Sequence, residues 1–205
     1  NTVLEPMTTA MLENLDEVTA HFSRFEVTEI TLSERGLAQF DHDRFLEAAN
    51  LLADAKCHVI AWNGTSAGWL GFGNDEELCA CITEATGVPS TTSIIANNDL
   101  FRRHGVSTFG LVTPYTDDVQ AKIIENYHKS GFHCVAERHL GISDNFSFSE
   151  ITEDQVADMC RAVAAEGAKA ISIICTNMRG AALTEHLEAE LEVVIYDSIA
   201  VVIRH

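Results

Sequence analysis

The chain has 205 residues, of which 46% are hydrophobic, enough to form one compact domain or two small lobes with a core. Its formal net charge of −18 argues against nucleic acid and anionic membranes as partners, because both would repel it. It contains no apolar run of roughly 18 residues that would predict a transmembrane helix, and no signal peptide is recognisable at Asn1. We therefore expect a cytoplasmic protein with a small-molecule ligand.

The chain alternates between stretches typical of helices and stretches typical of strands. Apolar residues at helical spacing predict helices at residues 5–20, 44–55, 75–86, 100–104, 117–129, 155–165 and 181–190. Runs rich in apolar and β-branched residues predict strands or extended segments at residues 25–32, 57–62, 88–93, 107–115, 133–142, 169–177 and 192–198. This alternation predicts an α/β fold in which doubly wound parallel sheets are flanked by helices.

The order of these elements repeats along the chain, with matching turns about 111 to 114 residues apart. The repeat predicts two pseudo-symmetric lobes that face each other across a cleft. We expect residues 1–98 and 194–205 to form the first lobe and residues 99–193 the second. The strand that opens the second lobe has no counterpart before Asn1, so we expect a short strand upstream of Asn1 in the natural protein. Whether the natural chain continues past His205 stays open.

Four turns follow predicted strands or precede predicted helices, at the positions where parallel α/β sheets bind ligands. Their backbone N–H groups, hydroxyls, thiol, phenol and amide are suited to holding a small anion. These turns are Gly64-Thr65-Ser66, Cys175-Thr176-Asn177, Pro114-Tyr115-Thr116 and Asn1-Thr2. Neither a nucleophile-elbow motif nor a Gly-rich phosphate loop is present, so serine-hydrolase and P-loop chemistry are not indicated.

Cys175 is the strongest candidate for a reactive side chain. It ends an apolar strand and precedes a predicted helix, and a helix N-terminus lowers the pKa of a thiol. The alternative is a buried structural cysteine, just as Tyr115 is either a functional phenol or a packing residue. The six cysteines contain no C-x-x-C pair and the nine histidines show no ligand spacing, so we predict no metal site.

Six stretches together carry a family resemblance and span nearly the whole chain. They are "NTVLEPMTTAML", "GTSAGW", "ATGVPSTTS", "VTPYTDD", "LGISDNFSFSEI" and "ICTNMRG". In this order they resemble the aspartate/glutamate racemase superfamily, in the branch that contains maleate cis-trans isomerase and arylmalonate decarboxylase. The resemblance implies a cofactor-free enzyme with two pseudo-symmetric lobes that acts on a small dicarboxylate in the cleft between them.

Racemases and isomerases of this superfamily use two cysteines, one from each lobe. The resemblance places the second-lobe cysteine at Cys175 and the first-lobe cysteine at Gly64, which carries no thiol. The decarboxylase branch also has glycine there; its substrate loses CO2 to give an enediolate, and the remaining cysteine delivers a proton. The resemblance therefore favours a lyase over an isomerase, with Cys175 as the single proton donor.

The resemblance also implies a set of substrate-binding residues around an oxyanion hole that holds the carboxylate. These residues are Gly64, Thr65, Ser66, Tyr115 and Thr176, together with Asn1 and Asn145, which resemble substrate-binding asparagines of the isomerase. Two alternatives stay open: a maleate-isomerase-like isomerase or racemase, and a non-catalytic small-carboxylate binding protein similar to proteins associated with ectoine utilisation. The substrate, its stereochemistry and homo-oligomer formation also stay open.

Overall fold

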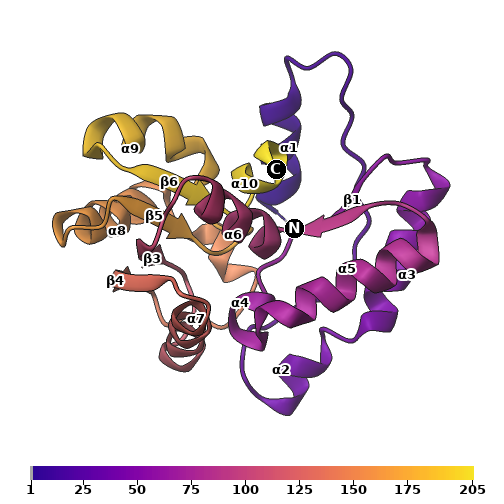
Figure 1. Ribbon diagram of the computed structural model, residues 1–205, viewed down its shortest axis with the longest axis horizontal. Helices are drawn as coiled ribbons and strands as arrows, with labels where there is room; N and C mark the ends of the chain where they lie inside the picture. Colours follow the sequence, from indigo (N-terminus) through magenta and orange to yellow (C-terminus); the bar gives the residue numbers. More distant parts are fainter. Residues whose placement is uncertain (1) are drawn as a thin grey trace.

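A computed structural model describes residues 2–205 and shows two parallel β-sheets flanked by helices (Figure 1). The larger sheet has four strands in the order β4-β3-β5-β6, and the smaller sheet pairs β1 with β2. The strands are β1 (Ile60–Trp62), β2 (Ser90–Thr92), β3 (Thr108–Val112), β4 (His133–Arg138), β5 (Ala170–Ile173) and β6 (Val194–Asp197). The predicted fold class is confirmed.

The helices lie around these two sheets in two groups. Figure 1 shows α7, α8 and α9 around the four-stranded sheet, α2, α3 and α5 on the side of β1, and α6 between the two groups. The α-helices are α1 (Leu4–Leu12), α2 (Glu34–Ala38), α3 (His42–Asp54), α4 (Ala67–Leu70), α5 (Phe72–Thr86), α6 (Ser93–Arg103), α7 (Asp117–Lys129), α8 (Glu153–Ala165), α9 (Thr184–Leu191) and α10 (Ala200–Arg204). Two 3-10 helices, η1 (Ser147–Glu150) and η2 (Ala181–Leu183), complete the elements.

The four-stranded sheet forms the core of the second lobe. Every residue of β5 is buried, as is all of β3 except Thr108, because helices cover the faces of a parallel sheet. Helix α8 and the turn that follows it pack so closely on β3 that a Cβ atom at Gly110 would lie 3.1 Å from the Cβ of Val163 in α8 and 2.8 Å from that of Ala168 after it. Glycine at this position therefore allows the direct contact between helix and strand.

Several helix ends follow from local sequence signals. Helix α7 has the predicted bounds 117–129, with Asp117 and Asp118 in its first turn, where carboxylates favour a helix N-terminus. Helix α5 ends at Gly87, which adopts the left-handed conformation (φ 71°) that favours glycine. Helix α8 begins with a reciprocal capping box between Thr152 and Gln155. These ends depend only on neighbouring residues, so the sequence predicts them well.

The N-terminal part of the chain differs from the prediction. Helix α1 ends at Leu12, and the predicted strand at 25–32 does not form; within residues 2–205 an isolated bridge between Glu29 and Asp144 is its one strand-like pairing. A strand needs a neighbour to satisfy its backbone N–H and C=O groups. High β-propensity alone therefore leaves this segment extended, with backbone hydrogen bonds to residues 143–145 only around the bridge.

The pairing of β6 bears on the predicted division into lobes. Strand β6 pairs in parallel with β5, with Val194 opposite Ala170 and Asp197 opposite Ile173. Residues 194–197 therefore belong to the sheet of the second lobe, although the predicted division counted residues 194–205 with the first. The remaining boundaries of that division stay predictions.

The two lobes share a continuous hydrophobic core. The ring of Trp69 packs edge-to-face on Tyr115 with centroids 5.3 Å apart, and the Asn126 amide donates to the carbonyls of Gly68 (2.9 Å) and Trp69 (3.0 Å). These contacts join α4 of the first lobe to α7 and the loop that precedes it in the second lobe. Within residues 2–205, no helix has both the length and the apolar character needed to cross a membrane.

Asp75 is a buried carboxyl group in the first turn of α5. Only 2% of the residue is exposed, and its carboxylate accepts a hydrogen bond from the Thr92 hydroxyl. Burial raises the pKa of Asp75 to about 7, and the Thr92 hydrogen bond only partly offsets this effect. The folded protein therefore holds a proton on Asp75 at pH values where the unfolded chain has released it.

This proton makes stability depend on pH. Because the folded pKa lies above the unfolded value, the free energy of unfolding falls as pH rises from about 4 to about 7. We expect Asp75→Asn to flatten this dependence and to stabilise the protein relative to wild type at pH 8, by on the order of 3 kcal/mol. Urea unfolding at pH 5 and pH 8 measures the effect, with Asp54→Asn, at an exposed position, as the control. An unchanged slope in Asp75→Asn would contradict this assignment.

Candidate active site

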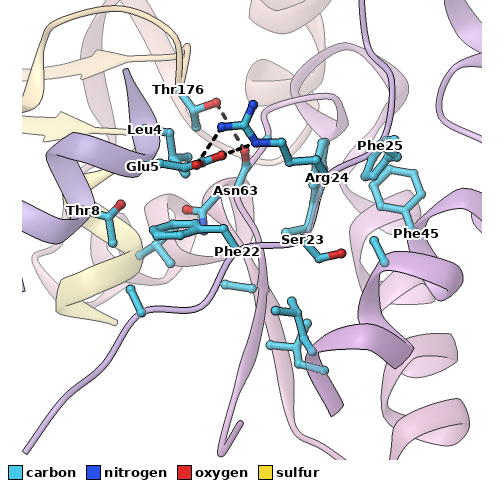
Figure 2. Close-up of a pocket in the computed structure, with 18 of the residues that line it drawn as sticks. Leu4, Glu5, Thr8, Phe22, Ser23, Arg24, Phe25, Phe45, Asn63 and Thr176 are labelled. Atoms are coloured by element: carbon cyan, nitrogen blue, oxygen red, sulfur yellow. Dashed lines mark hydrogen bonds and ion pairs between the residues drawn. The ribbon is translucent and has the colours of Figure 1, made fainter. Parts of the chain in front are cut away.

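A cavity with a volume of about 1050 Å³ lies between the lobes and extends along β1. Figure 2 shows part of its wall, formed by residues from α1, the segment between α1 and α2, α3, and the two site turns. The predicted site residues within the described chain all line it, namely Gly64, Thr65, Ser66, Tyr115, Asn145, Cys175 and Thr176. The eighth, Asn1, lies outside the described residues.

Cys175 lies two residues after the end of β5 and is only 3% exposed. No helix begins at this turn, because the first helical residues after it are those of η2 and α9. Burial raises the pKa of the thiol to about 12, although the N–H of Asn177, 3.4 Å from Sγ, acts in the opposite direction. The expectation that a helix N-terminus lowers this pKa is therefore wrong. At neutral pH Cys175 is a protonated thiol.

Tyr115 links the second lobe to the turn of the first. Its hydroxyl lies 2.8 Å from the hydroxyl of Thr65 in a buried hydrogen bond, and its ring packs on Trp69 and Phe148. Burial and the nearby Cys175 raise the pKa of Tyr115 well above its ordinary value. The phenol is therefore neutral and retains a proton that it can donate.

The turn opposite Cys175 has no room for a side chain at Gly64. A Cβ atom built there would lie 2.0 Å from Cζ2 of Trp62, well inside any allowed contact. The Trp62 indole is held by Phe25 and Phe45, with centroids 5.1 and 4.8 Å away, and its N–H donates to the Ser66 hydroxyl at 3.4 Å. Trp62 thus occupies the space that a thiol at position 64 would need.

Two further contacts cross the cavity near Cys175. The Thr176 hydroxyl donates to the carbonyl of Asn63 at 3.2 Å, a pair visible in Figure 2. The Asn145 side chain donates to the carbonyl of Val27 at 2.7 Å. Asn145 therefore lines the cavity but directs its amide to the backbone of the first lobe.

Asn177 ends one of the predicted ligand-binding turns, but it was not among the predicted site residues. Its side-chain amide donates to the carbonyl of Asn145 at 2.7 Å, and its side-chain oxygen accepts from the N–H of Val3 at 3.2 Å. Together with its own N–H on Cys175, these bonds join α1 and the loop before α8 to the thiol turn. Its place directly after Cys175-Thr176 is the one sequence signal that points to it.

Asp197 is a second residue that the sequence analysis missed. It ends β6, is fully buried, and accepts hydrogen bonds from the N–H groups of Ile199 (2.8 Å) and Ala200 (3.2 Å). Burial raises the pKa of Asp197 to about 7, and its negative charge in turn raises the pKa of Cys175. An acidic residue at the carboxyl end of an otherwise apolar strand is the signal that could have found it.

The charged residues of the cavity wall include a bidentate ion pair. Arg24 contacts both carboxylate oxygens of Glu5, at 2.6 and 2.7 Å, as Figure 2 shows. This pair lowers the pKa of Glu5, chiefly through the hydrogen bond from Arg24. Within residues 2–205, no group of three or more His, Cys, Asp or Glu side chains is arranged to hold a metal ion.

The arrangement is therefore a cleft with one buried thiol, neutral hydroxyls from both lobes and, in the first-lobe turn, no side chain at Gly64. The family model described as arylmalonate decarboxylase matches residues 5–202. The chain belongs to the arylmalonate decarboxylase family. The family takes its name from an enzyme, arylmalonate decarboxylase.

Solved structures with 20–22% identity show the same two-lobed fold. A liganded double mutant of arylmalonate decarboxylase is 21% identical, with 85% of this chain and 74% of that chain covered and a TM-score of 0.77. The maleate isomerase Iso from Pseudomonas putida S16 is 21% identical over 97% of this chain and 84% of its own, with a TM-score of 0.87. A Nocardia farcinica maleate cis-trans isomerase mutant with a covalently bound succinylcysteine intermediate is 21% identical over 98% and 84%, with a TM-score of 0.88. Among curated proteins, none matches this sequence.

The clash at Gly64 predicts that a second thiol cannot be added there without cost. We expect Gly64→Cys and Gly64→Ala each to lower the free energy of unfolding by about 1 to 3 kcal/mol, because each adds a Cβ against Trp62. Gly73→Ala is the matched control, since a Cβ at Gly73 meets nothing within 4 Å. Urea unfolding compares the three variants. Full stability of Gly64→Ala would contradict the packing described.

The high pKa of Cys175 predicts slow alkylation. At pH 8 we expect iodoacetamide to modify Cys175 at least roughly tenfold more slowly than the partly exposed Cys57, because the thiolate is the nucleophile. The rate at Cys175 should still rise with pH above pH 10. Peptide mapping by mass spectrometry at several times follows each cysteine separately. Fast modification of Cys175 that is independent of pH would show that the thiol is already ionised.

Proposed function

We propose that the protein is a cofactor-independent decarboxylase of a small malonate-type dicarboxylic acid. The observation that supports this most directly is the pairing of one buried, protonated thiol, Cys175, with a turn that carries no side chain at Gly64. One acid on one face of the substrate is sufficient for decarboxylation followed by protonation. Racemisation needs an acid and a base on opposite faces.

The reaction has two steps. First, the bond between the α-carbon and one carboxylate breaks, CO2 leaves, and the electron pair forms an enediolate with the remaining carboxylate. The Sγ proton of Cys175 then transfers to the α-carbon, forming a C–H bond and leaving a thiolate. Water returns a proton to the thiolate, so the enzyme ends each cycle unchanged.

The pKa of Cys175 suits this role. A thiol with a pKa of about 12 keeps its proton at neutral pH until a strongly basic carbon appears nearby. The thiolate that forms accepts the hydrogen bond from the Asn177 N–H, and the interaction with Tyr115 also lowers the pKa of the thiol. The thiolate is thus stabilised only after proton transfer, as catalysis by differential binding requires.

The turn of the first lobe is suited to holding the enediolate. The backbone N–H groups of Thr65 and Ser66 donate no hydrogen bond to any other group in residues 2–205. The hydroxyls of Thr65 and Tyr115 lie beside them and belong to opposite lobes. Preorganised donors of this kind contribute about 3 kcal/mol each to the stabilisation of a developing oxyanion.

Two alternatives give different products. A maleate isomerase mechanism requires a first-lobe thiolate to add to the double bond, and Gly64 with Trp62 beside it supplies none. Cys57 also lines the cavity but begins the extended stretch before β1, about seven residues and roughly 20 Å of chain away from Gly64. A carboxylate-binding protein without catalysis would need only the donors of the first-lobe turn.

Replacement of Cys175 tests the proposed reaction. With a disubstituted malonate as substrate, we expect Cys175→Ala to lower the rate of product formation by roughly 100- to 10,000-fold, because the proton donor is lost. In D2O the wild-type product should carry one deuterium at the α-carbon with a single configuration. CO2 release and chiral chromatography of the product measure both effects. Cys160→Ala, which removes another buried thiol outside the cavity, is the control and should retain activity.

The other outcomes distinguish the alternatives. Loss of the cis alkene from maleate without CO2 release would replace the proposal with an isomerase. A thermal shift with malonates or maleate, without either reaction, would replace it with a binding protein. Full decarboxylase activity in Cys175→Ala would show that the proton comes from another residue.

A further inference from the structure

His139 lies between two carboxylates at the carboxyl end of the four-stranded sheet. It directly follows β4, and α7 lies beside this strand (Figure 1). Its Nδ1 is 2.8 Å from Oε2 of Glu137 in β4, and its Nε2 is 2.8 Å from Oδ1 of Asp117 in the first turn of α7. Both ring nitrogens of this half-buried side chain therefore have an acidic partner.

These two contacts require a doubly protonated ring. An ionised carboxylate only accepts hydrogen bonds, and a neutral imidazole has a single N–H, so only an imidazolium donates to both groups. Burial alone would lower the pKa of His139, but the hydrogen bonds and charges of Glu137 and Asp117 together raise it above its ordinary value. The geometry therefore describes His139 as a cation.

The charged residues next to these partners in the chain are directed elsewhere. Arg138 forms an ion pair with Glu166, and its guanidinium also donates to the carbonyl of Glu137. The carboxylate of Asp118 accepts from the hydroxyl of Thr116 at 2.6 Å. The two carboxylates in contact with the ring are thus the charged groups that bear directly on its protonation.

From Glu137 a directional series of hydrogen bonds runs into the core. The same Oε2 atom accepts from the side-chain amide of Gln120 at 2.8 Å. Because that end of the amide is the donor, its oxygen faces the Thr113 hydroxyl, which donates to it at 2.7 Å. The Thr113 oxygen in turn accepts from the N–H of Tyr115 at 3.3 Å. Since Gln120 and Thr113 are almost completely buried, the loss of either partner would destabilise this arrangement.

The loop after β4 also holds the Tyr115 turn through its backbone. The N–H of Gly141 donates to the carbonyl of Tyr115 at 3.0 Å, and that of Ile142 donates to the carbonyl of Pro114 at 2.9 Å. Side-chain and backbone contacts therefore converge on one turn. It is the turn whose phenol pairs with Thr65 across the two lobes.

We infer that His139, as a cation, is a positioning residue that fixes the Tyr115 turn of the active site through this series of hydrogen bonds. When the ring loses a proton, one of its nitrogens presents a lone pair to a carboxylate, and that contact becomes repulsive. The hold on Glu137, and through it on Gln120, then weakens. The consequence for catalysis rests on the proposed function, in which the Tyr115 hydroxyl helps to hold the enediolate. The charge of His139 and its hold on the turn do not.

NMR titration and hydrogen exchange test the hold on the turn without reference to activity. In the wild-type protein we expect the His139 ring to titrate above the ordinary value of about 6.5, and Asp117→Asn to lower its midpoint. At pH 6 we expect His139→Gln to speed exchange of the Tyr115 amide by at least roughly tenfold, and to change the Ile171 amide in the centre of the sheet less. His186→Gln, at an exposed position on α9, is the control and should change neither amide.

The pH dependence of turnover tests the consequence for catalysis. With a disubstituted malonate, we expect His139→Gln to lower kcat by roughly 3- to 30-fold at pH 6 with little change in KM, because Tyr115 acts on the developing enediolate. The ratio of wild-type to variant kcat should fall toward one as pH rises and the wild-type ring loses its proton. Because Asp75 and Asp197 also titrate near pH 7, this ratio, and not either profile alone, isolates His139. His186→Gln should match the wild type at every pH.

Three results would overturn the inference on structural grounds. They are a His139 ring that titrates at or below its ordinary value, equal exchange at Tyr115 in wild type and His139→Gln, and equal acceleration at Tyr115 and Ile171, which would indicate a general loss of stability. In an active enzyme, a kcat ratio that is the same at every pH would also overturn it, since the charge would then have no effect. Absence of CO2 release by the wild-type protein would overturn the proposed function and leave the titration and exchange tests in force.

Discussion

The hydrogen bond between Thr65 and Tyr115 joins the lobes where the carboxyl ends of their sheets meet. The two hydroxyls are 2.8 Å apart, and both residues are almost fully buried. In such surroundings a hydroxyl without a hydrogen-bond partner would destabilise the folded state, so each lobe provides the partner for the hydroxyl of the other. The same contact holds the first-lobe turn opposite Cys175. The proposed reaction requires the turn and the thiol to keep this arrangement.

The site is asymmetric although the lobes are built alike. In the second lobe the turn after β5 carries the Cys175 thiol, which accepts a hydrogen bond from the Asn177 N–H, whereas in the first lobe the turn after β1 has Gly64 packed against the Trp62 indole. Two phenylalanines hold the Trp62 ring in place. The space beside Gly64 is therefore filled by a packed aromatic cluster. The proposed reaction depends on this loss of symmetry at one residue, because it requires only the thiol of Cys175.

Most of the fold could be predicted from the sequence, because its signals are local. The acidic first turn of α7 and Gly87 at the end of α5 place helix ends within a residue, and the alternating pattern predicts parallel sheets. The strand at 25–32 could not be predicted correctly, because its formation depends on a neighbour in space. The pKa of Cys175 was misjudged for a similar reason: burial, which a sequence does not display, outweighs the effect expected from a helix that does not begin there. Asn177 acts through Val3 and Asn145, which are far away in the chain, and Asp197 acts through its charge near Cys175.

The placement of the aromatic cluster also has an optical consequence. The chain contains two tryptophans, and both Trp62 and Trp69 line the cavity. One packs against the phenylalanines beside Gly64, and the other packs on Tyr115. All of the indole fluorescence therefore originates at the walls of the cleft. The unlabelled protein carries its own spectroscopic reporter of what enters that space and of how closely the lobes approach each other.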